Sequence, residues 1–281
     1  MQIVDSRWLI QLSTTLLSNS YLATLVTRNI NTTAQKGICV PFLNCYSCPG
    51  ALFSCPVGTV QHFAAIGAFP IYPLAFLILV GITAGRMSCG WLCPFGFLQE
   101  LLHKIQSPKH RIPDVLHYGK YLALIILVVL LPVVTSETWF CKLCPAGSLT
   151  AAIPWALWNP VNPGTGQPVL PHGPGIMFWI GLSILTLFLC WSILSKRPFC
   201  RVACPLGAFL SFFNSTSIVR LEVDPACDGC DLCEKVCPME TNVSKAPNSS
   251  ECIRCLECTA CDYVKLSVTW SSRKEIPDEI N

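Results

Sequence analysis

One stretch decides the fold of the last part of this chain: Cys227-Asp-Gly-Cys230-Asp-Leu-Cys233-Glu-Lys-Val-Cys237-Pro238. Its spacing is that of bacterial ferredoxins, in which three thiolates bind one [4Fe–4S] cluster and the fourth binds a second cluster. Fourteen residues later a second run follows, Cys252-Ile-Arg-Cys255-Leu-Glu-Cys258-Thr-Ala-Cys261. The two runs predict a small ferredoxin-like domain, residues 216–281, that holds two clusters.

The fourth cysteine of each run is expected to cross over to the other cluster. One cluster is therefore predicted on Cys227, Cys230, Cys233 and Cys261, and the other on Cys252, Cys255, Cys258 and Cys237. The second run closes with two intervening residues instead of three and has Asp262 where proline is usual, so Cys261 departs most from the pattern. Zinc knuckles are the alternative, but zinc sites normally pair two ligands with two distant ones.

The composition indicates a membrane. Of the 281 residues 52% are hydrophobic and only 12% are charged, whereas soluble domains carry about 25% charged residues. The net charge of +3 is too small to predict a nucleic-acid partner. No G-x-G-x-x-G or Walker-type loop occurs, so no nucleotide cofactor is expected. Nineteen cysteines in Cys-x2-Cys and Cys-x3-Cys groups favour metal ligation over cross-linking.

Four apolar stretches approach the length of about 20 residues that a spanning helix needs. They are residues 70–85, extended backward through 63, residues 121–134, residues 176–194, and a more polar stretch at 8–26. The predicted fold class is mostly α, with a four-helix integral membrane domain (1–215) built from two parallel repeats, followed by the ferredoxin-like domain.

Basic residues in short loops predict the orientation of the spans. They gather in two loops: Arg86, Lys104, Lys109, Arg111 and Lys120 in one, and Lys196, Arg197, Arg201 and Arg220 in the other. The other loops contain few. We therefore expect a multi-pass protein of a prokaryotic inner membrane, in contact with lipid, with both termini and the ferredoxin-like domain in the cytoplasm.

The membrane part contains an internal duplication. Two Cys-x3-Cys-Pro motifs follow spans on the basic side, ending at Pro94 and Pro205, and two Cys-x2-Cys-Pro motifs precede spans on the opposite side, ending at Pro49 and Pro145. Parallel repeats pack around an axis normal to the membrane, so each face is expected to gather four thiols. The predicted quartets are Cys89, Cys93, Cys200 and Cys204 (inner) and Cys45, Cys48, Cys141 and Cys144 (outer).

Other interpretations of these thiols stay open. The inner cysteines could be reduced residues that only pack. The outer ones could form disulfides in an oxidising compartment, with Cys39 and Cys55 as a further pair. Either quartet could instead bind a metal or a further cluster.

These motifs resemble those of the NapH and MauN group of membrane ferredoxin-type proteins and of the membrane half of NosR. The similarity extends from about Cys39 to Cys261, and its strongest marks are the paired inner motifs followed by the double cluster run. It implies electron transfer between quinol or cytoplasmic donors and redox partner proteins, with this chain as a candidate quinol-oxidising subunit. No catalytic residue is identified.

Two other functions remain as alternatives. One is a membrane reductase or maturation factor, in which outer thiols meet soft Cu(I) or exchange with the disulfide of a partner. The other is an assembly subunit whose clusters are structural.

Overall fold

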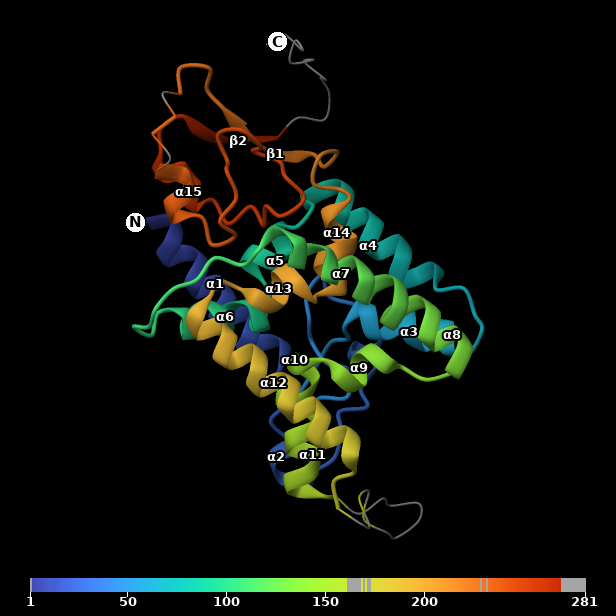
Figure 1. Ribbon diagram of the computed structural model, residues 1–281. Helices are drawn as coiled ribbons and strands as arrows, with labels where there is room; N and C mark the ends of the chain where they lie inside the picture. The colour runs from blue at the N-terminus through green and yellow to red at the C-terminus, as the bar shows by residue number, and fades with distance from the viewer. Residues whose placement is uncertain are drawn as a thin grey trace.

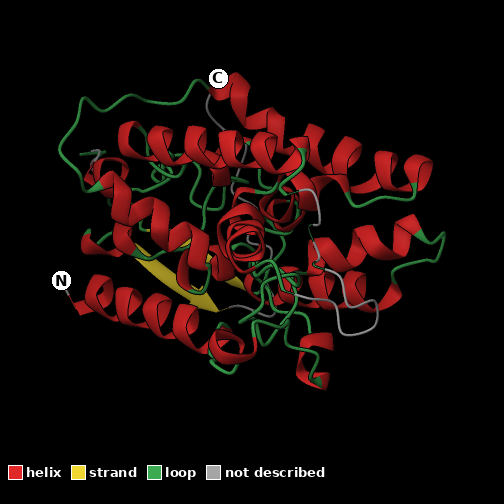
Figure 2. Ribbon diagram, turned by 90° about the horizontal axis from the view of Figure 1, so that it is seen from below, coloured by secondary structure: helices red, strands yellow, loops and turns green. Residues whose placement is uncertain are grey.

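The computed structural model of the chain is mostly helical, as predicted (Figure 1). It describes residues 2–160, 168, 170, 173–227, 229–230 and 232–268, so the last part of the predicted 216–281 domain lies outside the described residues. Figure 2 shows the helices as separate rods with loops between them and two strands.

Up to residue 103 the described helices are α1 (Gln2–Ser18), α2 (Thr24–Thr27), α3 (Pro56–Ala65), α4 (Ile71–Ala84), α5 (Met87–Trp91) and α6 (Pro94–His103). A 3-10 turn covers Ala34–Gly37. After residue 103 the chain forms α7 (Gly119–Ala123), α8 (Leu131–Thr135), α9 (Trp139–Leu143), α10 (Pro145–Gly147), α11 (Ile153–Trp158), α12 (Ile176–Leu194), α13 (Pro198–Val202) and α14 (Pro205–Ser211). A 3-10 turn at Asp114–Tyr118 precedes α7, and π-helical segments at Leu124–Leu130 and Ser148–Ala152 follow α7 and α10.

Among the described residues, two helices are long and apolar enough to cross a membrane, namely Asp114–Thr135 and Ile176–Leu194. The span predicted at 63–85 is broken, because α3 ends at Ala65 and the chain turns at Gly67, with φ +70°, before α4 begins. α4 is therefore only 14 residues long. The predicted four-helix membrane bundle is thus found only in part.

The stretch predicted at 8–26 is also interrupted, since α1 ends at Ser18. One face of α1 buries Arg7 and Gln11, and both side chains donate hydrogen bonds to the Gly90 carbonyl oxygen, at 3.3 and 2.8 Å. The opposite face exposes leucines such as Leu9 and Leu16. α1 is therefore held against the loop that contains Cys89 and Cys93.

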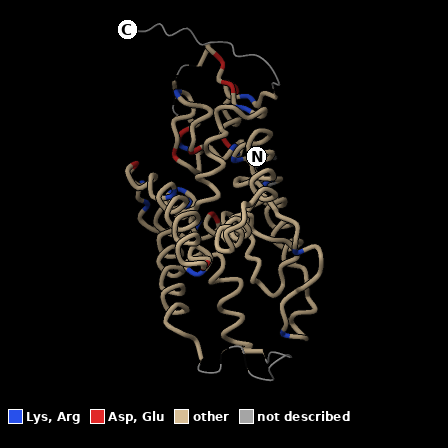
Figure 3. Tube along the Cα trace, turned by 90° about the vertical axis from the view of Figure 1, so that its right-hand side faces the viewer, with Lys and Arg blue, Asp and Glu red and all other residues tan. Residues whose placement is uncertain are grey.

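The C-terminal part forms one antiparallel ribbon. β1 (Val219–Val223) pairs with β2 (Val264–Val268), with Val219 opposite Val268. The two cysteine runs lie between the strands and include α15 (Leu232–Val236) and a 3-10 turn at Glu257–Ala260. This tail lies at one end of the molecule, and Figure 3 shows that most charged residues gather in and next to it.

The tail shares a hydrophobic core with the helices. Met239 and Ile253 of the tail are buried in the same cluster as Phe95, Phe199 and Leu206 of the helical part. A second, smaller cluster beneath the ribbon contains Leu221 and Val264. The tail is therefore packed onto the helices by apolar contacts and is not a loosely attached appendage.

Candidate metal centres

Four helices begin with the same tetrapeptide, Cys-Pro-x-Gly. These are α3, α6, α10 and α14, which start after Cys55, Cys93, Cys144 and Cys204. Proline suits the first helical position because its φ is already helical and no N–H is needed there. In α6 and α14 the glycine N–H donates to the cysteine Sγ, at 3.4 Å in each case. The motif therefore fixes each thiol at a helix start.

The predicted inner thiols lie together. All four are buried, and they come from α5, α6, α13 and α14: Cys89, Cys93, Cys200 and Cys204. Burial, together with the neighbouring Cys200 and Cys89 thiols, raises the pKa of Cys93 to about 12. The pKa of Cys204 is raised by burial and then by the Cys200, Cys89 and Cys93 thiols. Iron that binds here has to displace the thiol protons.

Two buried arginines flank the inner quartet in a reciprocal arrangement. Arg197, in the second half, donates to the Cys89 carbonyl oxygen at 2.8 Å. Arg86, in the first half, donates to the Cys200 carbonyl oxygen at 3.3 Å. Both guanidinium groups are fully buried. The inner site therefore has two fixed positive charges beside four thiols, which suits a centre of negative charge.

The outer thiols are arranged differently from the predicted quartet. A small cavity is lined by Cys45, Cys55, Cys141 and Cys144. Cys48 is absent from this lining, and its Sγ lies 3.7 Å from Asn19 Oδ1. The structure thus brings Cys55, which the sequence analysis considered only as part of a disulfide, to the position expected for Cys48.

A signal for Cys55 is present in the sequence. Cys55-Pro-Val-Gly58 repeats the tetrapeptide of Cys93-Pro-Phe-Gly96, and a glutamine follows six residues after each cysteine, Gln61 and Gln99. Cys48-Pro-Gly has no such continuation, and no helix begins there. Helix-start chemistry therefore separates the two candidates where Cys-x2-Cys spacing alone does not.

The second tail run lies beside Cys237, as the crossed ligand pattern requires. Burial raises the pKa of Cys258 to about 12, and Cys252 and Cys237 add to the shift. The pKa of Cys255 is also raised, mainly by burial, and the Cys237 thiol is among the smaller causes of the rise. These four thiols are buried.

The first tail run is more open. Burial raises the pKa of Cys233, and the nearby Cys261 thiol adds to it. Cys233 and Cys261 are buried, Cys227 is half-buried and Cys230 is exposed. This predicted set is therefore the one nearest to solvent.

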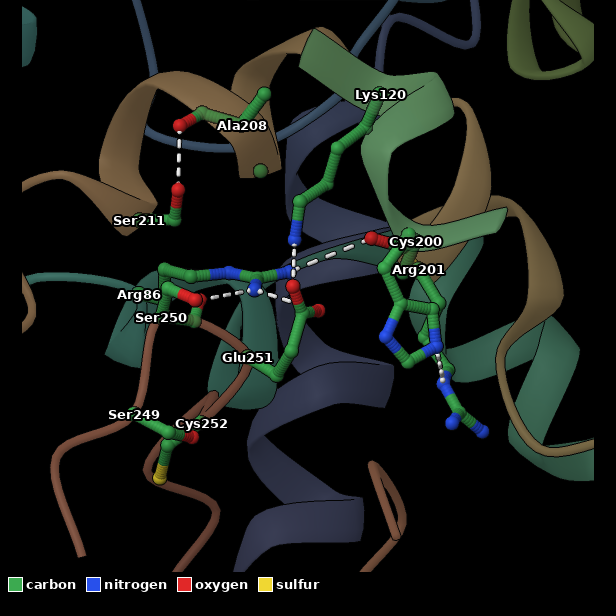
Figure 4. A network of polar contacts seen from close by, with 12 residues as sticks. Arg86, Lys120, Cys200, Arg201, Ala208, Ser211, Ser249, Ser250, Glu251 and Cys252 are labelled. Atoms are coloured by element: carbon green, nitrogen blue, oxygen red, sulfur yellow. Dashed lines mark hydrogen bonds and ion pairs between the residues drawn. The ribbon is translucent and has the colours of Figure 1, made fainter. Parts of the chain in front are cut away.

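A buried polar network joins the inner quartet to the tail (Figure 4). Arg86 donates to the Ser250 carbonyl oxygen at 2.6 Å and lies 3.4 Å from Glu251. Lys120 forms an ion pair with the same Glu251. Arg201 pairs with Glu240 at 2.6 Å. Basic residues that the sequence analysis used only for orientation therefore bind the acidic residues of the tail.

The donor chemistry fits iron–sulfur clusters. Within the described part of the chain, no three carboxylate, imidazole or thiol groups stand close enough to hold a single metal ion, whereas a cubane cluster keeps its four thiolates farther apart. All nineteen cysteines lie within that part, and no disulfide joins any of them there.

Comparison with known proteins agrees with this donor set. Residues 66–113, 120–157 and 176–220 match a family described as a 4Fe–4S binding domain. An uncharacterised protein of Methanocaldococcus jannaschii is 33% identical over 233 residues, which cover 78% of this chain and 88% of that protein. This chain belongs to the 4Fe–4S binding domain family.

The predicted resemblance is confirmed. As a member of the 4Fe–4S binding domain family, the chain is a ferredoxin-type protein that binds [4Fe–4S] clusters through cysteines. The methylamine utilization ferredoxin-type protein MauN of Paracoccus denitrificans is 28% identical over 182 residues, 61% of this chain and 58% of MauN. The regulatory protein NosR of Pseudomonas aeruginosa is 27% identical over 199 residues, 66% of this chain and 26% of NosR. No solved structure matches the chain.

Proposed function

We propose that this chain is an integral membrane electron carrier with two [4Fe–4S] clusters in the tail and a further cluster on the inner quartet. The ligands are the two crossed sets of the tail and Cys89, Cys93, Cys200 and Cys204. A bound [4Fe–4S] cluster accepts and releases one electron at a time, at a potential set by hydrogen bonds and exposure around the sulfurs. The protein supplies the thiols, excludes water and fixes the distance between sites.

The continuous packing between the tail and the inner quartet carries this proposal. Cys237 and Cys255 of the tail belong to the same hydrophobic cluster as Cys89, Cys93 and Cys204. The two segments approach closely at Gly90, where a Cβ would lie 2.5 Å from the Ile253 carbonyl oxygen and 3.5 Å from the Cys255 Cα. Electron tunnelling weakens steeply with distance, so direct contact between the two ligand loops favours transfer between them.

The membrane setting is part of the proposal. Two apolar helices, Asp114–Thr135 and Ile176–Leu194, have the length of spans, and α4 and α1 would complete a multi-pass domain of residues 1–215 in a prokaryotic inner membrane. Basic loop residues lie at the tail end, where Arg86, Lys120 and Arg201 form ion pairs with acidic tail residues (Figure 3). Because Lys and Arg of short loops favour the cytoplasmic side, this placement favours a cytoplasmic domain of residues 216–281.

A pair of serine variants tests the proposal. The protein is purified anaerobically in detergent, its iron and acid-labile sulfide are measured, and its clusters are titrated by low-temperature EPR. Cys204→Ser should remove one cluster and leave the tail signals. Cys190→Ser, at an exposed position of α12, should change nothing. Iron-free wild-type protein, or a Cys204→Ser variant with an unchanged cluster content, would refute the proposal.

Quinol exchange is a second candidate, favoured by an apolar cavity. The cavity measures about 740 Å³ and lies between the α3–α4 turn and the Asp114–Thr135 helix, with Val60, Phe69, Leu74 and Val128 among its lining residues. Ligand pockets commonly have this size and apolar character. A short-chain quinol should reduce the clusters of the wild-type protein. Val128→Trp, which fills the cavity, should slow that reduction but leave the reduction of the clusters by dithionite unchanged.

The copper- or thiol-reductase alternative has less support. A thiol that exchanges disulfides needs exposure and a depressed pKa. Burial instead raises the pKa of Cys45 to about 12, and Cys55 and Cys144 are buried.

A further inference from the structure

We propose that the outer thiols of Cys45, Cys55, Cys141 and Cys144 hold another [4Fe–4S] cluster, and that Gln61 is its positioning residue. The inference rests on the proposed function as an electron carrier and deepens it, because it adds a relay beyond the inner quartet, farther from the tail. It also replaces Cys48 by Cys55 in the ligand set.

The cavity that these thiols line has few polar groups apart from the thiols themselves. Its other lining residues are apolar, aromatic or glycine apart from Asn44. A Cβ on Gly58 would lie 3.4 Å from Cys141 Sγ, and a Cβ on Gly147 would lie 3.5 Å from Cys45 Sγ. The two helix-start glycines thus leave room beside the thiols that a larger residue would fill.

Gln61 links the two halves of this site. Its side chain is fully buried. The amide Nε2 donates to Cys141 Sγ at 3.3 Å, and Oε1 accepts from the Phe140 backbone N–H at 2.9 Å. The side-chain amide of Gln61 therefore holds both Cys141 and the preceding Phe140 in place.

The inner quartet has the same device. Gln99, also fully buried, donates from Nε2 to Cys200 Sγ at 3.2 Å and accepts from the Phe199 N–H at 3.1 Å. Gln99 follows Cys93 by six residues, as Gln61 follows Cys55. Two sites with the same helix start, the same glutamine and the same Phe-Cys partner have the same architecture, so a cluster that suits the inner site suits the outer one.

The alternatives for the outer thiols fit less well. A disulfide would use only two of the four thiols, and it would give no role to the hydrogen bond that Gln61 donates to Cys141. A single ion needs closer ligands than any trio of thiol, imidazole or carboxylate groups in the described ranges provides. Cys48 has its own partner in Asn19 and does not line the cavity.

The outer site is near enough to the inner one to relay electrons. Gly181 of α12 packs on the outer loop, since a Cβ there would lie 3.3 Å from the Lys142 carbonyl oxygen. Phe188 of the same helix packs on Phe199, beside Cys200, with ring centroids 5.2 Å apart. Seven residues separate Gly181 from Phe188, which is about 10 Å along a helix axis. The membrane core is about 30 Å thick, so these two contacts on α12 are much closer together than its two faces, which favours electron transfer between the sites.

The ligand set is tested by a matched pair of variants in the anaerobically purified full chain. Cys55→Ser should lose one cluster's share of iron and sulfide and one Mössbauer component, while Cys48→Ser keeps both. The reverse result, equal iron in both variants, or zinc in place of iron would overturn the proposal. If the outer site fails alone, the tail and Cys204-dependent signals persist. If the electron-carrier function fails, those signals are absent from the wild-type protein as well.

A second measurement keeps the proposal falsifiable if Cys55→Ser does not fold. A hydrogen bond to a thiolate stabilises the more negative reduced cluster, so its loss lowers the potential. Gln61→Glu keeps an acceptor for Phe140 but removes the donor, and it should lower the midpoint potential of one cluster only. Gln99→Glu should lower that of a different cluster, the one that Cys204→Ser removes. A Gln61→Glu protein with all potentials unchanged would contradict the inference.

Discussion

The indole N–H of Trp91 donates a hydrogen bond to the backbone carbonyl oxygen of Arg254, at 2.9 Å. This bond joins the loop between Cys89 and Cys93 to the middle of the second tail run. The two ligand loops are therefore fastened together by a side chain as well as by packing. Since the residues at both ends lie beside cysteines, the bond also fixes the separation of the two candidate centres.

Loss of this bond should loosen the tail locally. We expect Trp91→Phe, which keeps an aromatic ring, to cost about 1 kcal/mol and to speed hydrogen exchange of the amides around Arg254. Trp139→Phe is the matched control, because Trp139 donates only to Thr135 at an exposed position. Equal exchange at Arg254 in the two variants would mean that the bond does not hold the loops together.

Close approach at Gly90 gives a steric test of the same contact. Gly90→Ala would drive a Cβ to 2.5 Å from the Ile253 carbonyl oxygen, and overpacking of this kind costs about 1–3 kcal/mol. We expect a lower unfolding temperature and slower electron exchange between tail and inner clusters. Gly37→Ala, which meets nothing within 4 Å, should leave both unchanged. A stable Gly90→Ala protein with wild-type kinetics would show that the tail can move away.

A buried ion pair at the tail should contribute more to the stability of the fold than an exposed pair elsewhere. Glu251 is shared by Arg86 and Lys120, whose side chains are fully buried, and removal of one partner from a buried pair costs about 3–5 kcal/mol. We expect Glu251→Gln to lower thermal stability strongly. Glu137→Gln breaks the more exposed pair with Lys142 and should cost about 0–1 kcal/mol. Thermal unfolding of the two variants in the same detergent makes the comparison.

Local patterns made parts of this molecule predictable, and long-range contacts set the limit. The eight tail cysteines could be predicted as ligands from spacing alone, because consecutive residues of one loop can wrap one cluster. Cys55 could not be assigned in that way, since it meets Cys141 only after the halves of the chain pack. The break at Gly67 was hidden because the residues around it are all apolar, so hydropathy alone continues the span. Arg86 and Lys120 were interpreted only as orientation signals because their partner Glu251 is more than a hundred residues away.

The charge beside the inner site gives the last prediction. Arg197 donates a hydrogen bond to the Cys89 carbonyl oxygen and forms an ion pair with Glu100, each at 2.8 Å. A positive charge stabilises the reduced, more negative cluster, so Arg197→Gln should lower the midpoint potential of the inner cluster. A drop on the order of 60 mV corresponds to a tenfold change in a one-electron equilibrium.

Glu100→Gln supplies the opposite arm of this experiment, because it removes a negative charge and should raise the same potential. The double variant, in which neither charge is left alone, should lie between the two. EPR titration of the signal that Cys204→Ser abolishes gives all three values. If the single variants moved this potential in the same direction, the effect would come from structural disturbance, and the electrostatic account of the inner site would be wrong.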